Sequence, residues 1–131
     1  MDKYEKVCEL ISRCNTEKRL NDLLPHGSGF DCDWKLEYEQ DDDTPILVGA
    51  FHPMNEVGFY LDWVNFKIGV VPFKNSFDIT FYRFYPGIEL LEEEIDMLKE
   101  YILDTVYWRL EDALEREEET ELSQSKEGVE N

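Results

Sequence analysis

The sequence predicts an α+β fold in which N-terminal helices precede a four-stranded antiparallel meander sheet, with one long C-terminal helix packed on one face of the sheet. Three features predict it: apolar residues at helical spacing before residue 25, four β-prone segments between residues 34 and 85, and a long helical pattern from residue 88. A chain of 131 residues has the usual size of one domain. Its 42% hydrophobic content is that of a chain with a buried core.

Two short helices, or one bent helix, are expected before residue 25. The first carries apolar residues at steps of three and four from Tyr4 to Cys14, the spacing of an amphipathic helix. The second takes Asn15 or Thr16 as its N-cap. It ends at Pro25, because proline cannot continue a helix.

Four strands are expected in the middle of the chain. The first alternates, with Trp34, Leu36 and Tyr38 on one face and charged residues on the other, as in a half-exposed strand. The connections are short, which favours antiparallel neighbours, because a parallel crossover needs a dozen residues or more. The expected strands are residues 34–40, 46–52, 59–71 and 77–85.

The phase of the last two strands gives two further expectations. In the third strand the apolar phase changes between Trp63 and Phe66, which predicts a β-bulge near Val64 or Asn65. The apolar face of the fourth strand is expected to hold Phe77, Ile79, Phe81 and Tyr85.

The last element is a helix that begins at Ile88 and keeps its period for about 25 residues. After Glu119 the polar run has no periodicity. The sequence therefore predicts one domain over residues 1–119 and an acidic disordered tail over residues 120–131. The apolar positions of the helix are Leu91, Ile95, Leu98, Ile102, Val106, Ala113 and Leu114.

Charge is the extreme property of the chain, with 31 acidic residues against 13 basic ones and a formal net charge of −18. Sixteen of the acids lie after Tyr85, where only four bases accompany them. Such a field repels nucleic-acid phosphates and attracts basic protein surfaces. We therefore expect a basic protein partner and no direct binding of nucleic acid.

The chain also lacks signals for membranes and secretion. It has no run of 18 apolar residues and no secretory signal pattern at its N-terminus. Its three cysteines, Cys8, Cys14 and Cys32, form no C-x-x-C pair, which favours free thiols in a reducing compartment. A cytoplasmic protein without membrane contact is expected.

The stretch LLPHGSGFDCDW, residues 23–34, is the one place where the sequence gathers chemically versatile side chains. Ser28 and His26 suggest a nucleophile and its general base, but the G-x-S-x-G pattern of hydrolases is absent. A metal site would use His26, Asp31, Asp33 and His52, yet neither zinc nor calcium spacing is present.

A structural turn explains the same stretch more simply. Gly27 and Gly29 permit positive φ angles, and Ser28 and Asp31 can bond nearby amides. Trp34 would then anchor the first strand in the core. The sequence therefore predicts no catalytic residue, no cofactor and no metal ion.

Carboxylates provide the second candidate site. On the C-terminal helix they recur at steps of three, four and seven, opposite the apolar stripe. A solvated surface explains them, and so does a face that binds a basic surface or imitates DNA phosphates. The predicted partner-binding residues are Glu37, Glu39, Asp41, Asp42, Asp43, Glu89, Glu93, Asp96, Glu100, Asp104 and Glu111.

The chain resembles small proteins of bacteriophages and gut mobile elements over most of residues 13–108. The resemblance lies in three stretches, RCNTEKRLNDLLPHGSGFDCDW, FHPMNEVGFYLDW and LKEYILDTVYW. Those proteins share an LLPHGSG-(I/F)-D-x-DW motif. The resemblance implies a phage-like origin and assigns no activity or functional residue. Small acidic phage proteins as a class often bind host machinery, including restriction and CRISPR nucleases.

The function we expect is that of an acidic, non-enzymatic binding protein, a phage-type inhibitor that mimics DNA and occupies a host nucleic-acid-binding or defence protein. One alternative is a metal-binding or hydrolytic protein that uses the loop from His26 to Asp33. Another is a structural homodimer formed through Tyr101, Tyr107 and Trp108 on the second face of the C-terminal helix.

Overall fold

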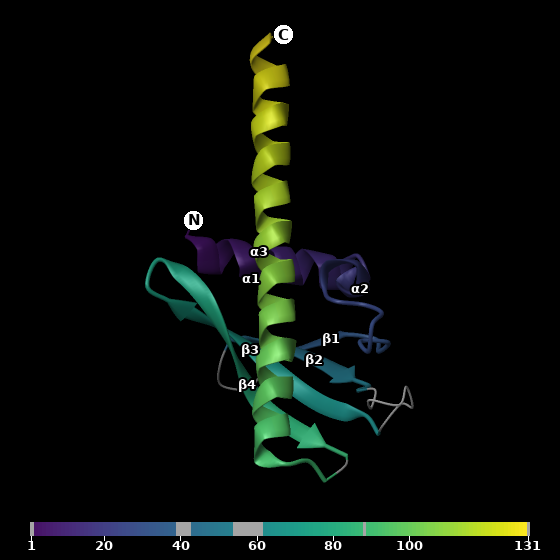
Figure 1. Ribbon diagram of the computed structural model, residues 1–131. Coiled ribbons are helices and arrows are strands. Elements are labelled where there is room, and N and C mark those ends of the chain that lie inside the picture. Colours follow the sequence, from purple (N-terminus) through teal and green to yellow (C-terminus); the bar gives the residue numbers. More distant parts are fainter. Residues whose placement is uncertain (1, 39–42, 54–61, 88, 131) are drawn as a thin grey trace.

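The computed structural model describes residues 2–38, 43–53, 62–87 and 89–130, and it has the predicted α+β fold (Figure 1). Two helices lead into a four-stranded sheet, and one long helix follows the sheet. The elements are α1 (Lys3–Thr16), α2 (Leu20–Leu23), β1 (Lys35–Tyr38), β2 (Pro45–Phe51), β3 (Val64–Phe73), β4 (Ser76–Pro86) and α3 (Glu92–Glu130).

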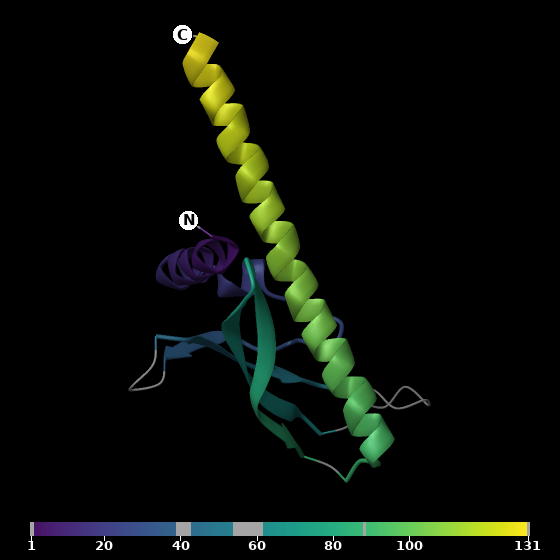
Figure 2. The same cartoon turned by 90° about the vertical axis from the view of Figure 1, so that its left-hand side faces the viewer.

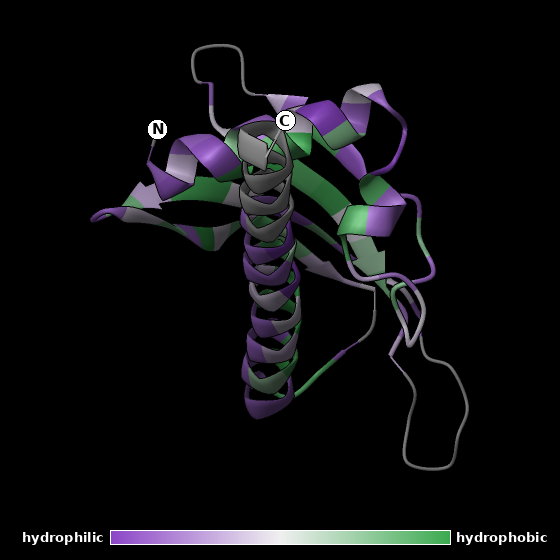
Figure 3. Ribbon diagram, turned by 90° about the horizontal axis from the view of Figure 1, so that it is seen from above, coloured by the Kyte–Doolittle hydropathy of each residue, from purple (hydrophilic) through white to green (hydrophobic). Residues whose placement is uncertain are grey.

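The sheet has the order β1-β2-β3-β4 with every pair antiparallel, so the predicted meander is confirmed. Paired residues such as Leu47 and Ile68 are buried on the side of the sheet that carries the helices. Figure 2 shows α3 crossing the sheet while α1 lies near one end of it. In Figure 3 the strands are largely hydrophobic and hydrophilic residues dominate the exposed sides of the helices.

The two N-terminal helices are joined differently from the prediction. Asp2 caps α1 by accepting a 2.8 Å hydrogen bond from the Glu5 amide. The residues expected to cap the second helix are near the end of the first, since α1 continues to Thr16, and α2 has Arg19 at its N-cap without a side-chain bond. Lys18 adopts a φ of 59° in the turn between the two helices.

Helix α3 begins at Glu92, four residues later than predicted. The Glu94 side chain accepts a 3.0 Å hydrogen bond from the Leu91 amide, which is half of a capping box. Leu91 is consequently outside the helix and 70% exposed, so its place on the apolar stripe was predicted wrongly. The buried stripe consists of Ile102, Val106, Leu110 and Leu114.

Helix α3 continues to Glu130, and its C-terminal part projects beyond the rest of the molecule (Figure 1). Residues 117–127 are mostly good helix formers, and no glycine or proline interrupts them before Gly128. Two ion pairs from α1 hold the base of the projection: Lys6 with Glu118 at 3.3 Å and Arg13 with Glu117 at 2.6 Å.

The β-bulge lies in a different place from the predicted one. Strand β3 begins at Val64 and alternates regularly, so no bulge is needed there. The irregularity is between Lys67 and Ile68, whose partners on β4 are Arg83 and Phe81. Tyr82 is therefore the extra residue, on β4.

This bulge changes which aromatic residues of β4 are buried. Beyond it the phase shifts by one residue, so Phe84 packs against the core and Phe81, with ring centroids 5.3 Å apart. Tyr85, which the sequence placed on the buried face, is 55% exposed. The prediction for Phe77, Ile79 and Phe81 is consistent with their burial.

We predict that Phe84→Ala lowers the free energy of unfolding by about 2 kcal/mol, whereas Tyr85→Ala lowers it by less than about 0.5 kcal/mol. The difference arises because only Phe84 packs against the core. Urea unfolding of the two variants measures both values, and a larger loss for Tyr85→Ala would contradict the bulge at Tyr82.

Candidate functional site

The glycine loop is a tight turn. Gly27 and Phe30 exchange two backbone hydrogen bonds, of 3.2 and 3.0 Å. Between them, Ser28 and Gly29 have φ angles of 51° and 101°, the positive values that a type I′ turn requires at both central positions. The backbone therefore forms the turn that the sequence predicts.

The turn is fixed against the end of β2. The His52 amide donates a 2.8 Å hydrogen bond to the Gly29 carbonyl. A Cβ atom on Gly29 would lie 2.6 Å from the ring of Phe51, so only glycine permits this approach. Phe30 packs edge-to-face on Phe51, with centroids 4.8 Å apart.

Asn21 of α2 joins the loop to the start of β1. Its side-chain amide donates to the Asp33 carboxylate at 3.1 Å, and its side-chain oxygen accepts from the Trp34 amide at 3.0 Å. The indole of Trp34 donates a 2.8 Å hydrogen bond to the Pro25 carbonyl. Asp33 and Trp34 thus hold the loop in place.

The four metal-ligand candidates are not brought together into a ligand set. His26, Asp31 and Asp33 are exposed, and His52 stacks on Trp63 with ring centroids 4.5 Å apart. Within the described ranges, no three His, Cys, Asp or Glu side chains form a group that could hold a metal ion.

Nor does the loop contain an activated nucleophile. Among the described residues, no hydrogen bond joins Ser28 to His26. Burial raises the pKa of the Cys32 thiol, despite the hydrogen bond that its sulfur accepts from the Ala50 amide at 3.2 Å. A raised pKa keeps that thiol protonated and unreactive at neutral pH.

The predicted carboxylates do not form one site. Glu37 on β1 pairs with Lys67 at 2.9 Å, on the sheet face away from the helices. Asp43 is exposed just before β2, and Glu39, Asp41 and Asp42 lie outside the described residues.

Four of the predicted carboxylates on α3 form a continuous exposed set with Glu89, which lies just before the helix. These five side chains make no hydrogen bond or ion pair with another described residue. This set supplies the candidate site, and it consists of Glu89, Glu93, Asp96, Glu100 and Asp104.

The two cations that could neutralise this set point elsewhere. The Lys99 ammonium lies over the ring of Phe84, 5.1 Å from its centroid. The Arg109 guanidinium donates to the carbonyls of Asp22 and Leu24, at 3.1 and 3.5 Å. Tertiary contacts thus hold both cations, and neither forms an ion pair with a carboxylate of this set.

Glu111 differs from the other predicted acids of α3. It is half-buried, and both of its oxygens accept from Lys3 of α1 at 2.8 Å, while one also accepts from the Tyr107 hydroxyl at 2.9 Å. Burial acts to raise the pKa of Glu111, but the hydrogen bonds from Lys3 and Tyr107 outweigh it and lower that pKa. Its place is in the α1–α3 contact.

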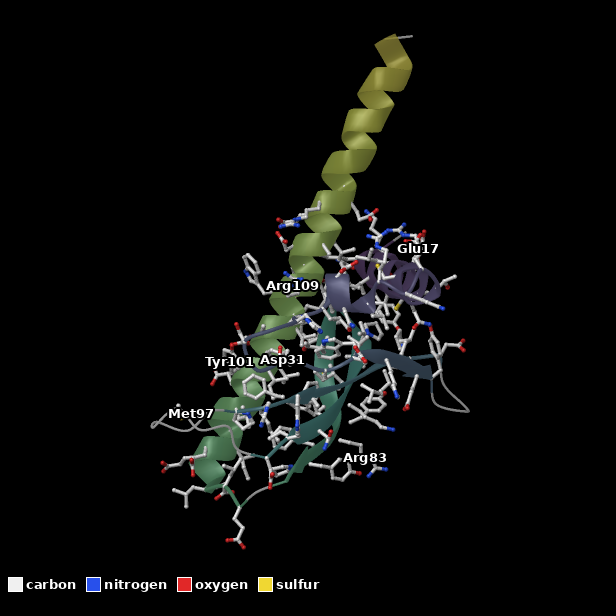
Figure 4. All side chains as sticks on the ribbon, turned by 90° about the vertical axis from the view of Figure 1, so that its right-hand side faces the viewer. Glu17, Asp31, Arg83, Met97, Tyr101 and Arg109 are labelled. Carbon is white, nitrogen blue, oxygen red and sulfur yellow. The ribbon has the colours of Figure 1, made fainter. Side chains whose placement is uncertain are left out.

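Exposed apolar residues accompany the carboxylates on α3. Met97, Tyr101 and Trp108 are 71%, 47% and 68% exposed. Figure 4 shows Met97 and Tyr101 on the side of the molecule away from Arg83. Tyr107, which the dimer hypothesis included, instead stacks on Phe77 at 4.9 Å. The hypothesis did not include Met97, although its spacing from Tyr101 and Trp108 is helical.

A hollow of about 230 Å³ between α1, α2 and α3 is lined by arginines and acids. Its charges are already paired: Arg19 with Glu17 at 2.7 Å and Arg116 with Asp112 at 3.1 Å. Arg109 is bound to the α2 carbonyls. Of the cations around the hollow, Arg109 thus joins α3 to the end of α2.

We predict that Gly29→Ala destabilises the protein by about 1–3 kcal/mol more than Gly27→Ala does. Both substitutions place alanine at a positive φ, which costs about 1–2 kcal/mol. Only Gly29 has a ring in the way of a Cβ atom, since nothing lies within 4 Å of one at Gly27. Thermal or urea unfolding compares the two variants, and equal losses would contradict the close approach to Phe51.

We also predict that Glu111→Gln lowers stability by about 1 kcal/mol at neutral pH. A lowered native pKa means that the ionised Glu111 stabilises the fold above the ordinary glutamate pKa of about 4.3. This contribution is lost as the pH falls through the lowered pKa. Urea unfolding of both proteins between neutral and strongly acidic pH should therefore show the difference shrinking, and a constant difference would contradict the pairing.

Comparisons with protein-family models, with curated proteins and with solved structures found no match to this chain. In the part of the chain that the structure describes, no helix is both long enough and apolar enough to cross a membrane. The functional argument therefore depends on the surface chemistry of the chain, above all on the exposed face of α3.

Proposed function

We propose that this protein is an acidic binding protein that presents the exposed face of α3 to a basic surface on another protein. The observation that carries the proposal is the carboxylate set on α3 without an ion-pair partner among the described residues, since both nearby cations are engaged in tertiary contacts. A folded chain with a net charge of −18 also attracts basic surfaces over a distance.

The proposal extends to DNA mimicry. Four exposed carboxylates share one side of α3 between residues 93 and 104: Glu93, Asp96, Glu100 and Asp104. At a rise of 1.5 Å per residue they span about 16 Å, or one charge in roughly 5–6 Å of helix, which is of the same order as the spacing of phosphates on DNA. One strand of DNA carries a phosphate every ~3.4 Å along its axis. The basic surface that we propose is therefore the nucleic-acid-binding surface of a host protein, of the kind that restriction or CRISPR nucleases have.

A solvated surface is the competing explanation, and its consequence for binding is different. Carboxylates that only maintain solubility can be neutralised without loss of any specific complex. Carboxylates that contact a basic partner contribute to its association, and their contribution falls with ionic strength.

The experiment begins with the immobilised protein and a bacterial lysate at low salt. Captured proteins are eluted with a salt gradient, identified and purified, and their affinity for the chain is then measured. We predict that Glu93→Gln, Glu100→Gln and Asp104→Asn together weaken binding at low salt at least about tenfold and flatten its salt dependence. Duplex DNA should compete with the chain.

A matched variant controls for the loss of net charge. Glu9→Gln, Asp31→Asn and Asp62→Asn remove as many exposed carboxylates from other parts of the surface, and no hydrogen bond or ion pair with a described residue is lost. This variant should keep its affinity. If both triple variants bind the partner equally well, or if no basic protein is captured, the α3 face is not the binding surface.

A further inference from the structure

We propose that the partner surface combines an apolar hollow with a row of Lys and Arg side chains along one side of it, and that Trp108 and Met97 anchor the complex in the hollow. This inference rests on the proposed function, because it concerns the same face of α3. It goes further by naming the chemistry of the partner and the residues that hold it.

The arrangement follows from helical geometry. With 3.6 residues per turn, Met97, Tyr101 and Trp108 fall within a sector of about 40° around the helix axis. We refer to them as the apolar line. Glu93, Glu100 and Asp104 occupy an adjoining sector of about 40° and form the acidic line. Each line extends for about 16 Å along α3.

The other flank of the apolar line contacts the core at Tyr101. The Tyr101 ring contacts Phe30 of the glycine loop and Phe51 of β2, with centroids 6.2 and 5.6 Å apart. Glu94 and Asp112 also lie on that flank, but Glu94 accepts the hydrogen bond from the Leu91 amide and Asp112 pairs with Arg116 at 3.1 Å, so the unpaired carboxylates border the apolar line on the other side. A complementary surface must match this asymmetry, with cations along a single edge of its apolar hollow.

The exposure of the apolar line distinguishes it from a purely electrostatic surface. Trp108 is 68% exposed and Met97 is 71% exposed. Tryptophan and methionine are enriched at the centres of protein interfaces, and tryptophan is among the commonest residues whose truncation costs most in affinity. Imitation of phosphates requires neither side chain.

Charge repulsion argues against a second copy of this chain as the partner that covers the apolar line. If two copies paired through their apolar lines, the acidic lines of both would lie at the edges of the same contact. The two acidic lines would repel each other, and the energetic cost of this repulsion rises as water is excluded from the contact. Lys99 and Arg109, the cations of α3 nearest the two lines, do not form ion pairs with the acidic line, because other contacts hold them. A basic partner removes the repulsion.

Two synthetic helical peptides of equal length and equal lysine content serve as defined probes. One is amphipathic, with leucines on the side opposite the lysines, and the other has alanine in place of each leucine. Titration calorimetry measures their affinities for the full chain at low salt and at high salt. We predict that the leucine peptide binds at least about tenfold more tightly, and that this advantage persists at high salt.

Substitutions in the apolar line test whether it causes the higher affinity of the leucine peptide. Trp108→Ser and Met97→Ser should each reduce affinity for the leucine peptide by about tenfold or more and leave the alanine peptide unaffected. Tyr38→Ser is the matched control, because Tyr38 is 52% exposed on β1, away from α3. Unfolding curves confirm that the variants remain folded.

The outcomes separate this inference from the proposed function. If both peptides bind equally, and Trp108→Ser and Met97→Ser change nothing, the apolar line is no anchor and the inference fails. Should Glu93→Gln, Glu100→Gln and Asp104→Asn together still weaken both peptides, the proposed function stands without it. A dimer in solution that Trp108→Ser dissociates would identify a second copy as the occupant and overturn the inference.

Discussion

Burial of one side of α3 is the constraint on which the rest of the molecule depends. Ile102, Val106 and Leu110 are fully buried in the core, and each buried side chain of this size contributes about 1.5–3 kcal/mol. Repulsion between like charges one turn apart costs about 0.2–0.5 kcal/mol per pair. Burial therefore outweighs the repulsion, and the helix can keep a strongly acidic outer side. Because the faces of a helix are fixed relative to one another, the same burial leaves Trp108 exposed.

The order and pairing of the elements could be predicted because they depend on periodicity and connection length, which are local properties of the sequence. The predictions failed where a single residue determines which side of a strand is buried or where a helix begins. Tyr82 is an extra residue in β4, so Phe84 is buried in place of Tyr85, and no composition signal marks it. The start of α3 depended on a bond from the Leu91 amide to Glu94, which a hydrophobic pattern does not contain.

The candidate site was less predictable than the fold. The sequence identified the carboxylates of α3, because their spacing is visible in one dimension. It did not show which charges have partners, since that depends on contacts between distant segments. The Lys99 ammonium lies over the Phe84 ring of β4, and the Arg109 guanidinium donates a hydrogen bond to the Asp22 carbonyl of α2. Glu111 is paired with Lys3, which is 108 positions away in the sequence. These contacts determine which carboxylates of α3 are available to a partner.

The glycine loop and the face of α3 belong to one argument, although the sequence suggested two separate sites. The positive φ angles at Ser28 and Gly29 turn the chain so that Phe30 enters the core beside Phe51. Both rings contact Tyr101 and limit its movement on one flank of the exposed face. A surface whose side chains are already ordered loses less conformational entropy when a partner binds. The turn therefore contributes to recognition by fixing the surface, without contacting the partner itself.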